Sequence, residues 1–174
     1  MSDLICELID EKDPFLREVP DVFDFDNPQV DPEKLEKQLL ENMLYHRGYG
    51  LSANQIGIPF TVFAMMVDND PLVVFNPEII EFSEETTYMK EGCLSYPGLY
   101  VAIERAYGVS TRFQLSQGEE QSGNFIELSA RIFQHESEHM DGDIFIDNVS
   151  GYRLKAAMRK RKSILRQLKK QKKG

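Results

Sequence analysis

The chain has 174 residues, 41% of them hydrophobic, which fits one compact domain with a real core. Its formal net charge is −9 at pH 7, yet residues 153–174 carry eleven Lys or Arg and no acid, which leaves nine basic and 29 acidic residues in 1–152. Two cysteines exclude a disulfide scaffold, no apolar run is as long as a membrane span, and the acidic N-terminal stretch resembles neither a secretory signal nor a transit peptide.

The first predicted helix follows an irregular segment. Residues 9–29 contain three prolines and predict extended chain with turns. Residues 31–48 predict the helix itself. Asp31 suits its N-cap, Pro32 its first position and Gly48 its end. Three apolar residues recur inside it at helical spacing: Leu35, Leu39 and Met43.

The middle of the chain favours β-structure. Residues 61–68 and 71–82 predict two strands joined by a short turn. Residues 86–106 mix strand-forming residues with turn residues. Residues 106–116 alternate polar and apolar side chains and predict a further strand, followed by a turn at 117–124.

Two more helices are predicted after these strands. Asn124 begins the first of them, with Glu127 three residues later in an arrangement that resembles a capping box, and the helix ends near Gly142. The second covers residues 152–173 and is strongly basic. No internal repeat and no linker divides the chain, so the predicted fold class is α+β.

The segment QHESEHMDG, residues 134–142, places His135 and His139 four residues apart, with Glu136 directly after the first histidine. On a helix such histidines share one face and can chelate one metal ion. A metal lowers the pKa of a water molecule that binds to it, and the glutamate can take that water's proton. The segment therefore predicts a metal site with its own base. The alternative is a helix whose histidines are satisfied by hydrogen bonds alone.

A catalytic metal site of this kind needs a third protein ligand. Downstream of the motif only acids are available: Asp141, Asp143 and Asp147. Upstream, Cys93 follows Gly92, which lets the backbone turn tightly, and a thiolate binds divalent metals strongly. The sequence favours Cys93 and leaves the acids as the alternative.

Three segments together resemble, in order and rough spacing, the signature motifs of the peptide deformylase family: GYGLSANQIG (48–57), EGCLS (91–95) and QHESEHMDG (134–142). The likeness covers about residues 1–152. It implies an α+β fold with small antiparallel β-sheets around a central helix that carries HExxH. It also implies a catalytic domain over 1–152, with 153–174 as a basic C-terminal helical extension.

The resemblance implies a metal and a proton carrier at matched positions. Cys93, His135 and His139 are implied as the ligands of one divalent metal. The implied metal is Fe²⁺ in the cell, and Zn²⁺, Ni²⁺ or Co²⁺ can occupy the site in purified protein. Glu136 is implied as the general base and acid.

Other matched positions are implied to hold the substrate. Gln55 and the backbone N–H of Leu94 would stabilise the oxyanion, and Gly50 would hydrogen-bond the peptide, which docks as an added strand. The methionine side chain of the substrate needs an apolar pocket, for which four residues near the motifs are candidates: Tyr49, Met89, Leu128 and Ile132. Plain core packing is the alternative for each of these four.

Four positions depart from the family's usual residues. Ser52 and Asn54 stand where Ala and Pro are usual, and Glu138 stands where Asp is usual. Ser137 replaces a residue that is commonly larger. A buried Ser52 needs a hydrogen bond. Asn54 lacks the rigidity of proline, so we expect a more mobile loop around Gln55. Glu138 is expected to hold a neighbour of the metal ligands. Since no ligand or base is lost, we expect activity with altered efficiency.

The function implied by the resemblance is hydrolysis of the formyl group from N-formyl-methionyl peptides of nascent chains, which gives formate and a free Met N-terminus. We expect a cytoplasmic monomer with no membrane partner, in a bacterial cell and encoded by a bacterium or a phage. Two other functions stay open. One is a metallopeptidase that cuts internal peptide bonds, and the other is a deformylase-like protein reduced to RNA binding.

The basic segment 153–174 predicts a partner of its own, because eleven bases without one acid form a strongly positive surface. The expected partner is ribosomal RNA near the exit tunnel, where formylated chains emerge. A solvated helix packed on the domain is the alternative.

Overall fold

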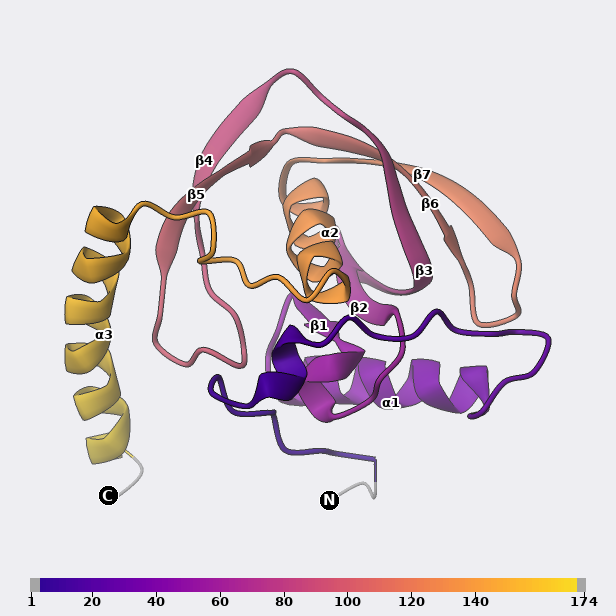
Figure 1. Ribbon diagram of the computed structural model, residues 1–174, viewed down its shortest axis with the longest axis horizontal. Coiled ribbons are helices and arrows are strands. Elements are labelled where there is room, and N and C mark those ends of the chain that lie inside the picture. The colour runs from indigo at the N-terminus through magenta and orange to yellow at the C-terminus, as the bar shows by residue number, and fades with distance from the viewer. Residues whose placement is uncertain (1–3, 172–174) are drawn as a thin grey trace.

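The computed structural model describes residues 4–171 and builds them around two antiparallel sheets (Figure 1). The larger sheet has the strand order β1-β2-β3-β6-β7. Its strands are Gly50–Ser52 (β1), Val62–Val67 (β2), Asp70–Phe82 (β3), Gly108–Gln114 (β6) and Glu120–Ile126 (β7). The smaller sheet pairs β4, Thr86–Glu91, with β5, Val101–Ala106. The strands predicted at 61–68, 71–82 and 106–116 are confirmed, apart from shifts at their ends.

Helix α1, Pro32–Tyr45, begins as predicted and ends shortly before Gly48. The side chain of Asp31 accepts hydrogen bonds from the first backbone N–H groups of the helix. The predicted apolar residues are all buried: Leu35, Leu39 and Met43. They pack in one cluster with residues of β1, β2 and β3, and each such side chain stabilises the fold by about 1.5–3 kcal/mol. Helix α1 thereby fixes β1, an edge strand of the larger sheet.

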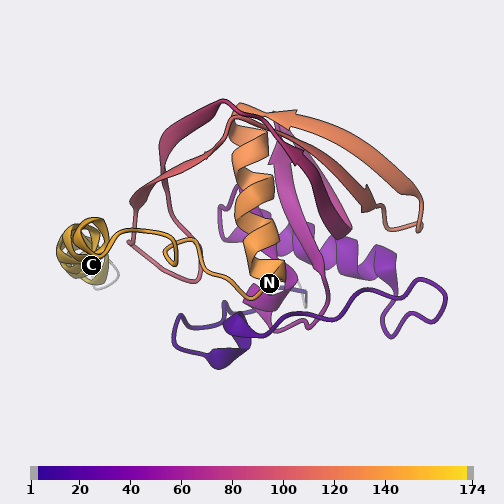
Figure 2. The same cartoon turned by 45° about the horizontal axis from the view of Figure 1, so that its top comes forward.

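Helix α2, Glu127–Met140, stands inside the curve of the larger sheet and carries the HExxH sequence (Figure 2). The predicted helix start at Asn124 is wrong, and so is most of the predicted turn at 117–124. Residues 120–126 instead pair with β6 along their whole length, and the helix begins at Glu127 without a side-chain cap. The non-local pairing with β6 outweighs the local capping pattern.

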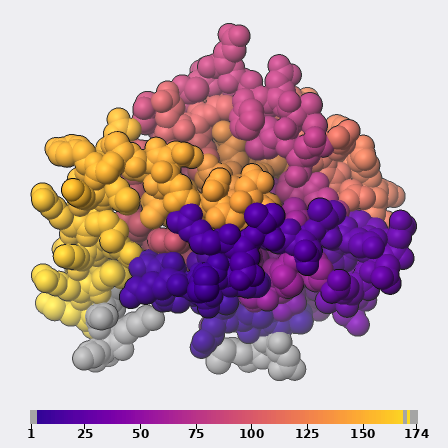
Figure 3. Space-filling model, in the orientation of Figure 1, coloured from indigo at the N-terminus to yellow at the C-terminus, as the bar shows by residue number. Residues whose placement is uncertain are grey.

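The N-terminal segment runs over the outside of the body, as the indigo surface in Figure 3 shows. It is extended except for a short 3-10 helix, Pro14–Arg17, whose first N–H groups are capped by Asp13. The backbone N–H of Ile9 donates to the carbonyl of Gln55 at 2.8 Å. This bond ties the segment to a second 3-10 helix, Ala53–Ile56, which follows β1. The predicted extended chain with turns over 9–29 is confirmed.

Helix α3, Gly151–Gln171, is the predicted basic helix and lies at one edge of the molecule, beside β5 (Figure 1). Residues 172–174 of the predicted extension lie outside the described residues. Within the described part of α3, the side chains of Ala157 and Arg161 are buried against the body. Over residues 4–171, no helix is long and apolar enough to cross a membrane. The α+β fold class is confirmed.

Candidate active site

Helix α2 directs His135 and His139 toward Cys93, which lies in the loop between β4 and β5. All three side chains are buried, and their ligand atoms lie within 4.8 Å of one another. The Sγ atom of Cys93 is 3.4 Å from Nε2 of His139. Of the downstream acids, Asp147 is occupied by an ion pair with Arg17. The third ligand favoured by the sequence, Cys93, is therefore the one that the fold brings to the histidines.

The donor set suits a divalent metal because one histidine is oriented by an acid. Nδ1 of His135 lies 3.1 Å from Oε2 of Glu91, which leaves Nε2 of His135 free for the metal. Metal-binding histidines usually make this kind of bond through their other ring nitrogen. A thiolate and two imidazoles match the preference of borderline divalent ions. The residues present therefore fit one metal ion.

Glu91 at the end of β4 is a site residue that the sequence reasoning missed. Besides His135, it accepts hydrogen bonds from Arg105, with Nε–Oε1 at 2.6 Å and Nη2–Oε2 at 2.9 Å, and from Nη1 of Arg131. Burial acts to raise the pKa of Glu91, but the bonds from His135 and Arg105 outweigh it and lower the pKa to about 2. The only sequence signal for Glu91 was its position directly before Gly92 and Cys93 in the motif EGCLS.

Arg105 joins Glu91 to the second acid of this network. Its Nη1 and Nη2 atoms donate to the two carboxylate oxygens of Glu138 at 2.7 and 2.8 Å. The prediction that Glu138 holds a neighbour of the metal ligands is confirmed, since Arg105 also contacts the acid that orients His135. The longer side chain of Glu, compared with Asp, still reaches a bidentate geometry.

The carboxylate of Glu136 is buried beneath the site, with 3% of the residue exposed. Burial raises the pKa of Glu136 to about 7, although the positive charge on His135 opposes the shift. Its Oε2 atom has no hydrogen-bond partner among the described residues. A carboxyl group of this kind is suited to exchange protons near neutral pH.

Gln55 is held by the residues around it in the loop after β1. Its Oε1 atom accepts hydrogen bonds from the backbone N–H and the hydroxyl of Ser52, both at 3.0 Å. Its Nε2 atom donates to Sγ of Cys93 and to Oγ of Ser95, both at 3.2 Å. The buried hydroxyl of Ser52 thus has the hydrogen bond that its burial requires.

Asn54 connects the same loop to helix α2. Its side chain is buried, and Nδ2 donates to the backbone carbonyl of His139 at 3.2 Å. A proline at this position could not make that bond. The expected mobility of the loop around Gln55 stays a prediction.

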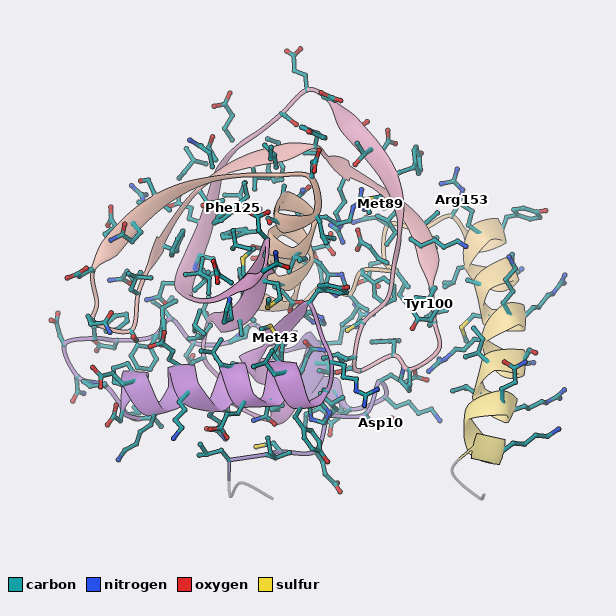
Figure 4. The ribbon with its side chains drawn as sticks, turned by 180° about the vertical axis from the view of Figure 1, so that it is seen from behind. Asp10, Met43, Met89, Tyr100, Phe125 and Arg153 are labelled. Carbon is teal, nitrogen blue, oxygen red and sulfur yellow. The ribbon has the colours of Figure 1, made fainter. Side chains whose placement is uncertain are left out.

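A cavity of about 540 Å³ opens over these groups. Its inner end is formed by Gln55, Cys93, His135 and Glu136, and Leu94 also lines it. The four predicted pocket residues all line the cavity: Tyr49, Met89, Leu128 and Ile132. Ile132 is buried and also packs in the core, whereas the other three are exposed to the cavity, so core packing does not explain them. Figure 4 places Met89 and Tyr100 on the β4–β5 side, next to α3.

Gly50 lets Glu136 approach the backbone of β1, and we expect a Gly50→Ala variant to lose activity. A Cβ atom on residue 50 would lie 2.3 Å from Oε1 of Glu136, so the carboxylate or the strand has to move. A displacement of about 1 Å at the chemistry costs roughly 100-fold in rate. The turnover rate and the metal content of the variant check this.

The matched control for that substitution is Gly151→Ala, because a Cβ atom at residue 151 meets nothing within 4 Å. We expect this control to keep full activity. A Gly50→Ala protein as active as the control would contradict the close approach of Glu136 to β1.

Known proteins share both this fold and these motifs. Residues 5–155 match the family model described as Polypeptide deformylase. Peptide deformylase from Thermotoga petrophila is 42% identical over 118 residues, which cover 68% of this chain and 72% of the relative. Peptide deformylase from Bartonella tribocorum is 36% identical over 162 residues, or 88% of this chain and 89% of the relative. The crystal structure of a peptide deformylase from Legionella pneumophila matches with a TM-score of 0.83 and 28% identity, over 94% of this chain and 97% of that one.

Proposed function

Because this chain belongs to the peptide deformylase family and is a hydrolase that removes the N-formyl group from nascent peptides, we propose which of its residues do so. One observation carries the assignment. Glu136, the amide of Gln55, Cys93 and His135 all line the inner end of one cavity, and the ligand atoms of Cys93, His135 and His139 lie within 4.8 Å of one another. The remaining cavity volume is open to a peptide.

Cys93, His135 and His139 would hold a divalent metal, as in other members of this metalloenzyme family. When bound there, the metal supplies a Lewis acid that polarises the formyl carbonyl and acidifies the attacking water. We propose that this metal is Fe²⁺ in the cell and that Zn²⁺, Ni²⁺ or Co²⁺ can occupy the site in purified protein. Protein purified without oxygen should contain iron by elemental analysis and lose activity in air. An iron-loaded form that stays fully active in air contradicts this choice of metal.

Glu136 carries the proton in this proposal. It accepts a proton from the attacking water, whose oxygen forms the new bond to the formyl carbon. It then delivers that proton to the amine nitrogen as the C–N bond breaks, which leaves formate and a free Met N-terminus. Burial raises the pKa of Glu136, which favours a carboxyl group that holds the proton between the two steps.

Gln55 and the backbone N–H of Leu94 would stabilise the tetrahedral oxyanion. Because Nε2 of Gln55 donates to Cys93 and Ser95 in this structure, we propose that the bond to Cys93 is exchanged for one to the substrate oxygen. Ser52 keeps Oε1 of Gln55 in place during that exchange. One such donor is typically worth about 3 kcal/mol in the transition state.

The peptide would add to β1 as a further strand, with Gly50 as a backbone partner. Two observations support this: β1 is an edge strand of the larger sheet, and Gly50 lines the cavity. The side chain of the first methionine would enter the apolar part of the cavity, which has four lining residues of that kind: Tyr49, Met89, Leu128 and Ile132.

The activity is tested by formate release from formyl-Met-Ala-Ser, with protein purified without oxygen and loaded with Fe²⁺ or Ni²⁺. We expect formate and free Met-Ala-Ser in equal amounts, with no cleavage of unformylated Met-Ala-Ser. Cleavage of the unformylated peptide would instead support an internal metallopeptidase. Absence of formate from protein that holds one metal would favour a protein reduced to RNA binding.

We also propose that α3 binds ribosomal RNA, because its exposed bases face solvent on a helix without acids: Arg153, Lys155, Arg159, Lys160, Lys162, Arg166 and Lys170. Replacing Lys155, Arg159, Lys162 and Arg166 by Gln removes four charges and leaves the buried side chains of α3 intact. We expect weaker binding to purified ribosomes. The slope of the logarithm of the binding constant against the logarithm of the salt concentration should become smaller, by up to roughly 0.9 for each phosphate that the helix no longer neutralises. Unchanged or salt-insensitive binding would leave α3 as a solvated helix.

We propose a cytoplasmic monomer, which light scattering behind a sizing column and cell fractionation test directly. The division into a catalytic part, 1–152, and an extension, 153–174, is part of the same proposal. In that division α3 starts two residues before the extension.

A further inference from the structure

One buried arginine of helix α3 holds a loop that lines the cavity. The residue Arg161 is only 7% exposed, in contrast to Lys160 and Lys162 beside it. Its Nε atom donates to the backbone carbonyl of Pro97 at 3.0 Å. Its Nη1 atom donates to Oε1 of Glu11 at 3.1 Å, and Nη2 donates to Oε2 of the same carboxylate. One guanidinium therefore joins α3, the β4–β5 loop and the N-terminal segment.

The loop that Arg161 holds is a wall of the cavity. Residues 96–100 all line it. The backbone N–H of Tyr96 donates to the carbonyl of Cys93 at 2.9 Å, and that of Leu99 donates to the carbonyl of Tyr96 at 3.1 Å. These two bonds connect the wall to the segment that carries Cys93.

Helix α3 also packs directly on the same wall. Gly98 has φ +73°, and a Cβ atom there would lie 3.2 Å from Cγ2 of Ile164. Ala157 belongs to the apolar cluster that contains Cys93, Tyr96 and Leu99. Figure 3 shows the yellow helix α3 next to the indigo N-terminal segment, in agreement with the bonds between Arg161 and Glu11.

A buried ion pair of this kind is costly unless its geometry is good, and replacing it by apolar side chains is often neutral for stability. If helix α3 only packed on the body, a leucine or methionine at position 161 would fill the same space without a buried charge. The guanidinium instead supplies directional bonds to a loop whose proline has no backbone N–H to anchor it.

We propose that Arg161 is a positioning residue for the substrate: it fixes the wall 96–100, so that helix α3 sets the affinity for the formyl peptide. This inference rests on the proposed use of the cavity by that peptide. Arg161 itself does not line the cavity and takes no part in the proton transfers. Its loss should therefore weaken binding of substrate and transition state alike, which raises KM and leaves kcat unchanged.

The test compares full-length Arg161→Met with Arg112→Met, which breaks an exposed arginine–carboxylate pair with Glu78 outside the cavity lining. We expect KM for formyl-Met-Ala-Ser to rise roughly three- to tenfold in Arg161→Met, with kcat within about twofold of the parent and one metal per chain. Glu11→Gln should shift KM in the same direction by less, because it keeps the bond to Pro97. Arg112→Met should match the parent.

An unchanged KM in Arg161→Met would overturn the proposal, and so would a loss confined to kcat that follows the fraction of folded protein. Calorimetric affinity for the product Met-Ala-Ser makes the same comparison without turnover. If the parent releases no formate, the proposed function fails, whereas equal product affinity of parent and Arg161→Met overturns the positioning role alone.

Discussion

Replacing Glu136 by alanine is expected to remove formate release almost completely while the protein still binds its metal. General acid–base catalysis by one side chain contributes about 10²–10⁴ in rate, and in the proposed mechanism Glu136 serves both the attack and the departure of the amine. The ligand side chains do not depend on it, since no hydrogen bond joins Glu136 to Cys93, His135 or His139 among the described residues. Formate release under single-turnover conditions and metal content by elemental analysis are the measurements.

Glu127→Gln is the matched control for Glu136→Ala, because Glu127 lies on the same helix but is exposed at its first residue. The control should keep full activity. If Glu136→Ala kept a tenth or more of the parent's kcat at neutral pH, another group would have to carry the proton.

Replacing Cys93 by alanine should abolish both metal binding and activity. It removes the thiolate from a group of three ligands, and it also removes one hydrogen-bond partner of Gln55. Loss of a residue that only supports a ligand costs about 10- to 100-fold in metal affinity, and loss of a ligand should cost more. Metal stoichiometry after dialysis and formate release at saturating metal are the two readouts.

The chain contains its own control for this experiment. Cys6 is the other free cysteine; it is half-buried beside α1 and does not belong to the group of Cys93, His135 and His139. We expect Cys6→Ala to hold one metal and to keep its activity. A Cys93→Ala protein that still retains one metal after dialysis would mean that the ligand set is not the one proposed.

Local signals in the sequence were sufficient for α1 and for the histidine pair of the candidate metal site. The N-cap at Asp31 and the apolar spacing behind it act within one helix, and the two histidines lie on one helical face. The start of α2 could not be predicted in this way, because Asn124 resembles an N-cap residue while its segment pairs with β6. At such a position, pairing between strands outweighs the local preference for a helix N-terminus.

Glu91 shows why part of the site could not be predicted. Its partners are Arg105 from β5 and Arg131 and His135 from α2, so its role exists only after β4, β5 and α2 are assembled. The same holds for Arg161, which reads as one more base in a basic helix until Glu11 and Pro97 are placed beside it. Contacts between distant segments carry no periodic pattern that a single sequence reveals.

The uneven distribution of charge gives the molecule a strong electric dipole. Residues 1–152 hold 29 acids and nine bases, while α3 collects the opposite sign along one edge. A polyanion therefore attracts α3 and repels the body, and it turns the protein before any contact is made. At physiological salt this electrostatic orientation of the protein acts over about 8 Å, the distance at which charges are screened. Because the wall 96–100 lies against α3, the same rotation brings this wall of the cavity nearer to the polyanion.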